Sequence, residues 1–218
     1  MSFDVRIRTP STNLIVGPTS SGKTVLAQSL IRHKEILFHP VPQYVIWLYS
    51  EQSSLPNQLI QDGLIHHYQQ GYESYEQLRS LVLRYSSAGV MLFLDDGASY
   101  FHQDFAKIFR EMSHHLSCTV FLITQQLFVQ NKHYRSLTLN CQNLFLMKNP
   151  RDSSFIHHLE RQYSPYQPGW LVKAYLRATR KPHSYLYFSF HQKTSDVTRV
   201  LSRLLPDEPK PVIVYIKN

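Results

Sequence analysis

Residues 17–24 read GPTSSGKT, and this octapeptide constrains what the chain can fold into more than any other segment. It matches the pattern G-x-x-x-x-G-K-[ST]. The apolar run NLIV precedes it and VLAQSLI follows it, so it lies where a strand turns into a helix. The glycines allow backbone N–H groups to curl around a phosphate, and the helix N-terminus adds partial positive charge. We therefore predict a phosphate-binding P-loop rather than an ordinary glycine-rich turn. Its nucleotide-binding residues are Gly17, Pro18, Thr19, Ser20, Ser21, Gly22, Lys23 and Thr24.

Two side chains of this loop have a defined chemistry. The Lys23 ammonium should reach the β- and γ-phosphates of a nucleotide, and the Thr24 hydroxyl should ligate Mg²⁺. The cofactors that we expect are therefore ATP and Mg²⁺.

Short apolar runs alternate with longer helical patterns along the chain, which favours an α/β fold with a mostly parallel sheet flanked by helices. The runs are continuous, as expected for strands that are covered on both faces. The predicted strands are 13–16, 44–49, 90–95, 118–124, 143–148 and 184–190. The predicted helices are 23–33, 74–85, 103–115 and 153–162, and Ser74 provides a helix start signal. Segment 163–183 has three prolines and is predicted to be irregular. We see no domain boundary and expect one ATPase domain over residues 1–218, with a basic portion from about residue 150 that is not clearly separable.

An acidic pair follows one of the apolar runs, in MLFLDD. A P-loop ATPase needs a carboxylate at the end of a strand near the loop. Asp95 would organise the metal, and Asp96 would orient the attacking water or accept its proton. The alternative is that the pair caps the next helix.

A pair of amides follows the next predicted strand, in VFLITQQ. At that strand end, Gln125 could sense the γ-phosphate or position the water. The alternative is that Gln125 and Gln126 are ordinary loop amides.

The formal charge of +8 is unevenly distributed. Residues 1–130 carry 9 Lys or Arg against 10 Asp or Glu, whereas residues 131–218 carry 14 against 5. A basic C-terminal third indicates an anionic partner, most commonly nucleic acid, and the alternative is a solvated basic surface. The candidates for contact with a phosphate backbone are Lys148, Arg151, Arg161, Lys173, Arg177, Arg180 and Lys181.

Few other features indicate chemistry. The only cysteines, Cys118 and Cys141, lie in apolar runs, and we expect buried free thiols. Three His doublets begin at residues 66, 114 and 157, but adjacent side chains chelate a metal poorly. With no signal-peptide pattern and no apolar run near 18 residues, we expect a soluble intracellular protein that has no membrane partner.

An ordered series of motifs resembles a known family. After GPTSSGKT come VIWLYSEQ, LFLDDG, SHHLSCTVFLITQQLF, YRSLTLN and LFLMKNPRD. The series resembles DNA-packaging ATPases of the HerA/FtsK superfamily, in the poxvirus-type branch found in large DNA viruses, Polinton/Maverick elements and adintovirus-like viruses. The C-terminal HQKTSDVTRVLSRLLPDEPKPVIVYIK is similar to the end of that branch, so the resemblance spans roughly residues 12–217.

The resemblance implies a RecA-like core of the additional-strand ATPase type. The strand that ends at Gln125 would lie between the P-loop strand and the strand that ends at Asp95. Many superfamily members have Asp-Glu where this chain has Asp95-Asp96. An arginine of one subunit completes the neighbour's site in this family, and Arg135 matches its position best, with Arg151 in reserve.

The resemblance further implies a homo-oligomeric ring, hexameric or pentameric, that translocates double-stranded DNA into a preformed viral capsid. The expected partners are DNA and a capsid or portal-vertex protein. The expected location is the virus assembly site in the host cytoplasm or nucleus, or the virion. Two alternatives stay open: another P-loop enzyme such as a small-molecule kinase, and an ATP-gated capsid-assembly scaffold that scarcely hydrolyses ATP.

Overall fold

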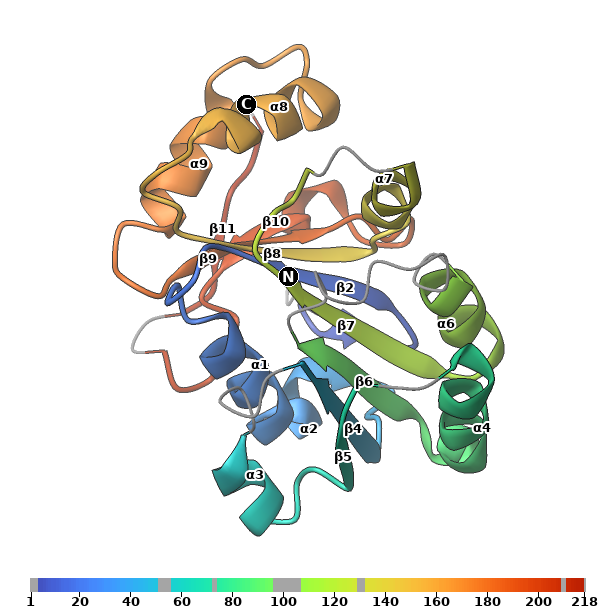
Figure 1. The fold of residues 1–218 in the computed structure, drawn as a ribbon. Helices are drawn as coiled ribbons and strands as arrows, with labels where there is room; N and C mark the ends of the chain where they lie inside the picture. The colour runs from blue at the N-terminus through green and yellow to red at the C-terminus, as the bar shows by residue number, and fades with distance from the viewer. Residues whose placement is uncertain are drawn as a thin grey trace.

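A nine-stranded sheet forms the centre of the molecule (Figure 1). The computed structural model describes residues 4–50, 56–71, 74–95, 107–128, 132–208 and 211–217. The strand order is β11-β10-β9-β8-β2-β7-β6-β4-β5. The sheet strands are β2 (Thr12–Val16), β4 (Tyr44–Tyr49), β5 (His67–Gln70), β6 (Val90–Asp95), β7 (Cys118–Thr124), β8 (Asn143–Met147), β9 (Tyr185–Ser189), β10 (Val200–Ser202) and β11 (Ile213–Val214). All pairings from β5 to β8 are parallel, and those from β8 to β11 are antiparallel. The expected α/β fold with a mostly parallel sheet is therefore confirmed.

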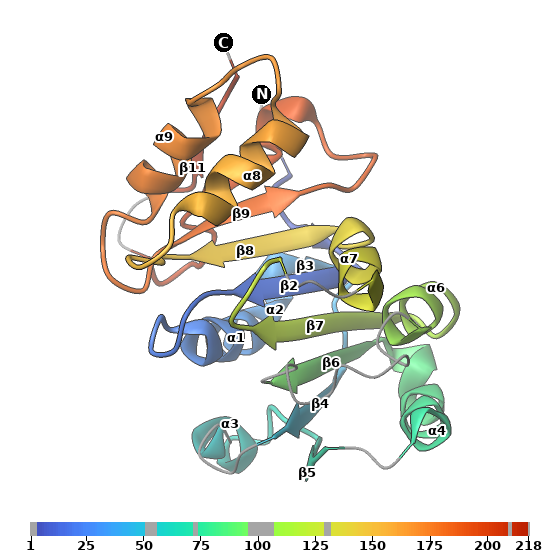
Figure 2. The ribbon, with the colours of Figure 1, turned by 45° about the horizontal axis from the view of Figure 1, so that its top comes forward.

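Helices cover both faces of this sheet (Figures 1 and 2). One face packs against α1 (Lys23–Arg32), α2 (Lys34–Leu37) and α3 (Asn57–Gln61). The other packs against α4 (Tyr75–Tyr85), a π-helical turn (Ile108–Met112), α7 (Lys132–Leu139), α8 (Ser154–Tyr163) and α9 (Trp170–Ala178), and α6 (Ser113–His115) continues the π-helical turn. A short parallel pair, β1 (Ile7–Arg8) and β3 (Phe38–His39), lies outside the main sheet. Because both faces are covered, the central strands have continuous apolar sequences.

The sheet core contains stacked aromatic rings. Trp47 and Phe93 stack with their ring centroids 5.1 Å apart, and Phe93 and Phe121 stack at 4.6 Å. Each ring is fully buried on the face covered by α1. Trp47 is therefore a core residue.

The order of the central strands agrees with the resemblance. β7 lies between β2 and β6, and it pairs in parallel with both. The register places Val16 opposite Thr124 and Leu94 opposite Leu122. The carboxyl ends of the three strands therefore meet at one edge of the sheet, where the P-loop begins.

One element was predicted wrongly. Segment 163–183 is not irregular, because it contains α9. The helix starts directly after Pro168 and Gly169, and it buries Leu171, Ala174 and Tyr175 at helical spacing. The prolines mark the loop before the helix and the turn after it.

Other expectations are confirmed. Ser74 caps α4, where its hydroxyl accepts a hydrogen bond from the Gln77 N–H at 3.3 Å. Cys118 and Cys141 are buried free thiols. The first part of the predicted helix 103–115 lies outside the described residues, and its described part is the π-helical turn and α6.

Candidate functional site

The octapeptide connects the buried strand β2 to α1, as the pattern predicts. Gly17 N–H donates to the Thr124 carbonyl at 3.2 Å, which ties the start of the loop to the end of β7. Ser21 N–H donates back to the Pro18 carbonyl at 3.2 Å, so the chain closes on itself. Ser20 and Gly22 have φ angles of 62° and 96°, in the left-handed region. The backbone is therefore held in a tight loop directly before a helix N-terminus.

Gly17 is required by a close approach. A Cβ atom at this position would lie 2.6 Å from Met147 Cβ on β8 and 2.6 Å from Ser21 Oγ. The Ser21 hydroxyl could rotate away, but Met147 Cβ is fixed to the backbone of β8, so either the loop or β8 would have to move. A glycine is needed because the loop crosses the end of β8 at backbone distance.

Two polar side chains of the loop, those of Ser21 and Lys23, turn inward, whereas Thr19 and Ser20 are exposed. The Lys23 ammonium donates to the Pro18 carbonyl at 2.9 Å and so spans the concave side of the loop. Ser21 Oγ is buried without a hydrogen-bond partner among the described residues. Thr24, in the first turn of α1, is half-buried. A curled backbone, a lysine across it and an unsatisfied hydroxyl are the features that a phosphate group fits.

Asp95 ends β6 and is almost completely buried, with 3% of its surface exposed. β6 is separated from β2 by β7 alone, so Asp95 lies about two strand spacings, or about 10 Å, across the sheet edge from the loop. A carboxylate and a threonine hydroxyl are oxygen ligands of the kind that Mg²⁺ prefers. Asp96 lies outside the described residues.

Gln125 follows β7 and lines a cavity of about 750 Å³ beside the P-loop, together with Gly17 and Pro18. A cavity of this size is typical of small-molecule sites. The next carbonyl, that of Gln126, accepts a hydrogen bond from the Tyr134 hydroxyl, which anchors the start of α7 at this edge. The structure thus brings Gln125 to the same edge as the loop and Asp95.

Arginines on the opposite wall of this cavity come from the segment after β8. Arg151 and Arg161 both line it. The Asp152 carboxylate lies between them in the sequence, and hydrogen bonds from Ser154 hold its pKa below the usual value. Arg151 therefore lines the same cavity as Gly17 and Pro18 of its own chain.

Arg135 occupies a different place. It is exposed on α7 and lines an adjoining cavity of about 650 Å³, with Tyr134, Thr138 and residues of α8. The two cavities share Leu127, Phe128 and His158, but no residue of the loop 17–24 lines the second one. Within one chain, the structure does not bring Arg135 to the P-loop. The seven basic residues expected to contact a phosphate backbone also divide: Arg151 and Arg161 face the cavity, whereas Lys173 and Arg177 are exposed on α9.

A contact that the sequence did not indicate lies on the other side of the loop. The His183 ring packs beside Gly22, where a Cβ atom would lie 3.1 Å from its Nδ1. Lys148, at the end of β8, donates to the Arg180 carbonyl at 3.4 Å and so holds the same connecting segment. His183 and Gly22 are far apart in the chain, and only the antiparallel pairing of β9 with β8 brings them together.

Two further properties concern the described part of the chain. It contains no group of three or more His, Cys, Asp or Glu side chains that could hold a metal ion. In the same residues, no helix has the length and apolar character needed to cross a membrane.

Comparisons with known proteins find only distant similarity. No protein-family model and no curated protein matches the sequence. Among solved structures, the fold is similar to the cytoplasmic domain of the Type VII secretion ATPase EccC of Thermomonospora curvata, with a TM-score of 0.49 and 15% identity over 84% of this chain. The chain spans only 23% of the length of that ATPase chain. It also matches a chain of the HORMA:CdnC:Trip13 complex of E. coli MS115-1, with a TM-score of 0.38, 15% identity, and coverage of 88% of this chain and 64% of that one.

Proposed function

We propose that the protein is a Mg²⁺-dependent ATPase. One observation carries the proposal: at a single edge of the sheet, the P-loop after β2, Gln125 after β7 and Asp95 at the end of β6 follow one another on adjacent strands. A phosphate-binding loop, a polar sensor and a buried acid are the parts that hydrolysis of a nucleoside triphosphate requires.

Each side chain has a proposed role. The N–H groups between Gly17 and Thr24 hold the phosphates, and Lys23 exchanges the Pro18 carbonyl for phosphate oxygens. Thr24 would ligate Mg²⁺ directly and Asp95 would hold it through water, and the ion would supply neutralisation of charge on the phosphates. Gln125 orients the attacking water, and Asp96 is proposed to accept its proton.

We further propose that hydrolysis drives translocation of double-stranded DNA in a homo-oligomeric ring of five or six subunits, and that it packages a viral genome into a capsid at the virus assembly site. The support is the net charge of residues 131–218 and the resemblance of the ordered motifs to the HerA/FtsK packaging ATPases. Arg135 of one subunit would complete the neighbour's site, and Arg151 would act on the site of its own chain.

The test is the ATPase rate of the purified protein with and without double-stranded DNA. Lys23→Ala should lower the rate by about 100-fold or more, because a charge-assisted donor to the phosphates is lost, while the thermal unfolding temperature stays unchanged. Asp95→Asn should lower the rate and raise the Mg²⁺ concentration that it requires. Arg79→Ala, on the exposed surface of α4, is the matched control and should retain the wild-type rate.

The outcomes separate the candidate functions. Near wild-type turnover in Lys23→Ala would contradict the P-loop assignment. A monomer whose turnover does not respond to DNA would favour the kinase, and ATP binding with negligible turnover would favour the scaffold.

A further inference from the structure

Another cavity, mostly polar, lies at the end of the sheet opposite the loop 17–24. It has a volume of about 210 Å³ and is formed by the N-terminal segment, the end of β3, the end of β9 and the loop between β9 and β10. We name it the basic notch. The residues that line it are mostly polar or charged: Asp4, Val5, Arg6, Arg8, His39, Tyr187, Ser189, Lys193, Thr194, Ser195, Thr198 and Leu201.

The basic notch is separate from the proposed nucleotide site. β9 runs antiparallel to β8, with Tyr185 opposite Met147 and Ser189 opposite Asn143. Met147 touches the P-loop, so Ser189 lies at the far end of the strand pair. A ligand in the notch therefore could not be the phosphates held between Gly17 and Thr24.

Positive charge in the notch is only partly balanced. Among the described residues that line it, Asp4 supplies the only carboxylate, and it pairs with Arg6 at 2.9 Å. Among the described residues, neither Arg8 nor Lys193 forms an ion pair. Both side chains are exposed, so two cations face a small polar cavity where an anion would relieve their repulsion.

The pKa of His191 is affected by the same excess of positive charge. Its pKa is lowered, first by burial and then by the positive charges of Arg8, Lys193 and Arg199. Three cations from two distant segments of the chain thus act on one ring beside the notch.

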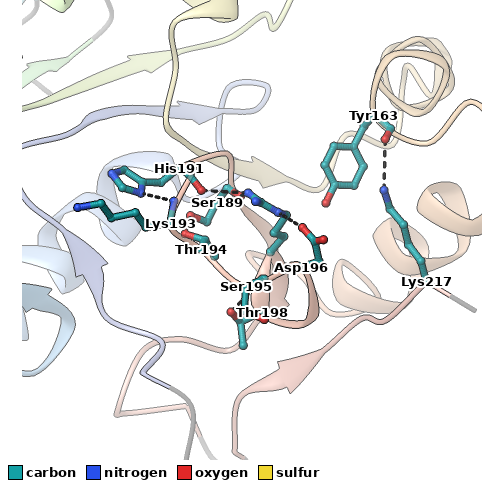
Figure 3. A network of polar contacts seen from close by, with 10 residues as sticks. Tyr163, Ser189, His191, Lys193, Thr194, Ser195, Asp196, Thr198 and Lys217 are labelled. Carbon is teal, nitrogen blue, oxygen red and sulfur yellow. Dashed lines mark hydrogen bonds and ion pairs between the residues drawn. The ribbon is translucent and has the colours of Figure 1, made fainter.

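The loop that presents Lys193 is rigidly built (Figure 3). Arg199 donates to Asp196 at 2.6 Å and to the carbonyls of Ser189 and His191 at 3.2 and 3.0 Å. Lys193 N–H donates to His191 Nδ1 at 3.1 Å. In Figure 3 the Lys193 side chain extends away from Asp196, on the same side as His191. Because Arg199 neutralises Asp196 inside the loop, Lys193 is left to face the notch on a preorganised support.

We propose that the basic notch binds a phosphate group of a nucleic-acid backbone, through Arg8 and Lys193. The cavity has room for a tetrahedral oxyanion, and its lining is mostly polar or charged. A contact of this kind positions a duplex and does not read its sequence. The net charge of residues 131–218 favours nucleic acid over a free anion, because many weak phosphate contacts must act together. This inference rests on the proposed function for the identity of the polyanion, but it does not depend on ATP.

The test is the affinity for a fluorescently labelled duplex of mixed sequence, measured by anisotropy without ATP at several salt concentrations. Arg8→Ala and Lys193→Ala should each weaken binding by up to about eight-fold at 0.1 M salt. The reason is that each phosphate contact multiplies the binding constant by about the salt concentration raised to the power −0.9. The plot of log affinity against log salt concentration has a negative slope, and this slope should become shallower by about 0.9 in each variant. Arg79→Ala removes the same charge from α4 and should change neither quantity. Circular dichroism and thermal unfolding check that each variant is folded.

Each outcome decides the matter. If the wild type binds the duplex and the Lys193 and Arg79 variants match it, the notch is not a DNA contact, although the proposed function stands. If the wild type binds no duplex, both the notch assignment and DNA translocation are wrong. If inorganic phosphate raises the unfolding temperature of the wild type but not of Lys193→Ala, while duplex binding is unaffected, the notch takes free phosphate and the nucleic-acid assignment is overturned.

Discussion

At the scale of single residues, the proposed nucleotide site requires that residue 17 has no side chain. Gly17 passes the end of β8 so closely that any side chain would collide with Met147 or Ser21. The position of the first loop N–H groups is therefore set by β8 as well as by β2.

We predict that Gly17→Ala weakens ATP binding by about tenfold or more. The added methyl group would move the loop away from β8, and overpacking of this kind also costs about 1–3 kcal/mol of stability. Isothermal titration with a non-hydrolysable ATP analogue measures the first effect. Gly63→Ala is the control, because its φ of +69° strains an alanine but nothing lies within 4 Å of the added atom. Equal loss of ATP affinity in both variants would mean that general destabilisation, and not the contact with β8, weakens binding.

The local part of this site could be predicted from the sequence. Gly17 to Thr24 form a contiguous motif, and Asp95 and Gln125 each follow a recognisable apolar strand. His183 could not be predicted, because its contact with Gly22 depends on how β9 returns beside β8. The position of Arg151 beside its own P-loop also needed the fold, since nothing in NPRD shows which way the chain turns after β8.

At the scale of elements, α8 and α9 are joined by one carboxylate. Glu160 on α8 is buried and accepts hydrogen bonds from the N–H groups of Gly169, Leu171 and Val172 at 2.9, 2.7 and 3.3 Å. These donors belong to the first turn of α9, which has no helical partners for them. A buried negative charge at a helix N-terminus is favourable for this reason.

We predict that Glu160→Ala lowers the free energy of unfolding by about 2–3 kcal/mol, because buried N–H groups lose a charged acceptor. Urea denaturation followed by circular dichroism measures the change. Glu160→Gln keeps one oxygen acceptor and should lose less than half as much. An alanine variant as stable as the wild type would show that water replaces the carboxylate at no cost.

The elements divide into predictable and unpredictable ones for a physical reason. Strands at the centre of the sheet are covered on both faces, so their sequences are continuous apolar runs. The edge strand β5 reads HYQQ, with side chains that are alternately half-buried and exposed, and no such run marks it. α9 was hidden because its charged outer face and the prolines around it resemble a loop.

At the scale of the whole molecule, the proposed catalytic site is incomplete within one chain. Arg151 lines the P-loop cavity, but Arg135 points into a different cavity. If Arg135 acts in catalysis, it must act on the nucleotide of another subunit.

We predict that Arg135→Ala binds ATP but does not hydrolyse it, and that mixing it with Lys23→Ala restores part of the activity. Mixed rings contain interfaces where an intact P-loop meets an intact arginine. Lys23→Ala mixed with Asp95→Asn is the control, because both residues belong to one nucleotide site and no interface regains a complete set. The readout is the ATPase rate against mixing ratio, with co-assembly checked by light scattering. Failure of the first mixture to exceed the second, despite co-assembly, would exclude Arg135 as a residue that acts between subunits.

The antiparallel strand β9 connects two loops that lie at opposite ends of the sheet. Its five residues connect the segment that holds His183 to the loop that holds Lys193, over a length of about 17 Å. The strand is hydrogen bonded to β8 on one side and to β10 on the other. An extended peptide has almost no slack, since it is already near its greatest reach. Because both ladders hold the strand, neither loop can shift along the strand axis without breaking ladder hydrogen bonds, and the spacing between the two loops is fixed.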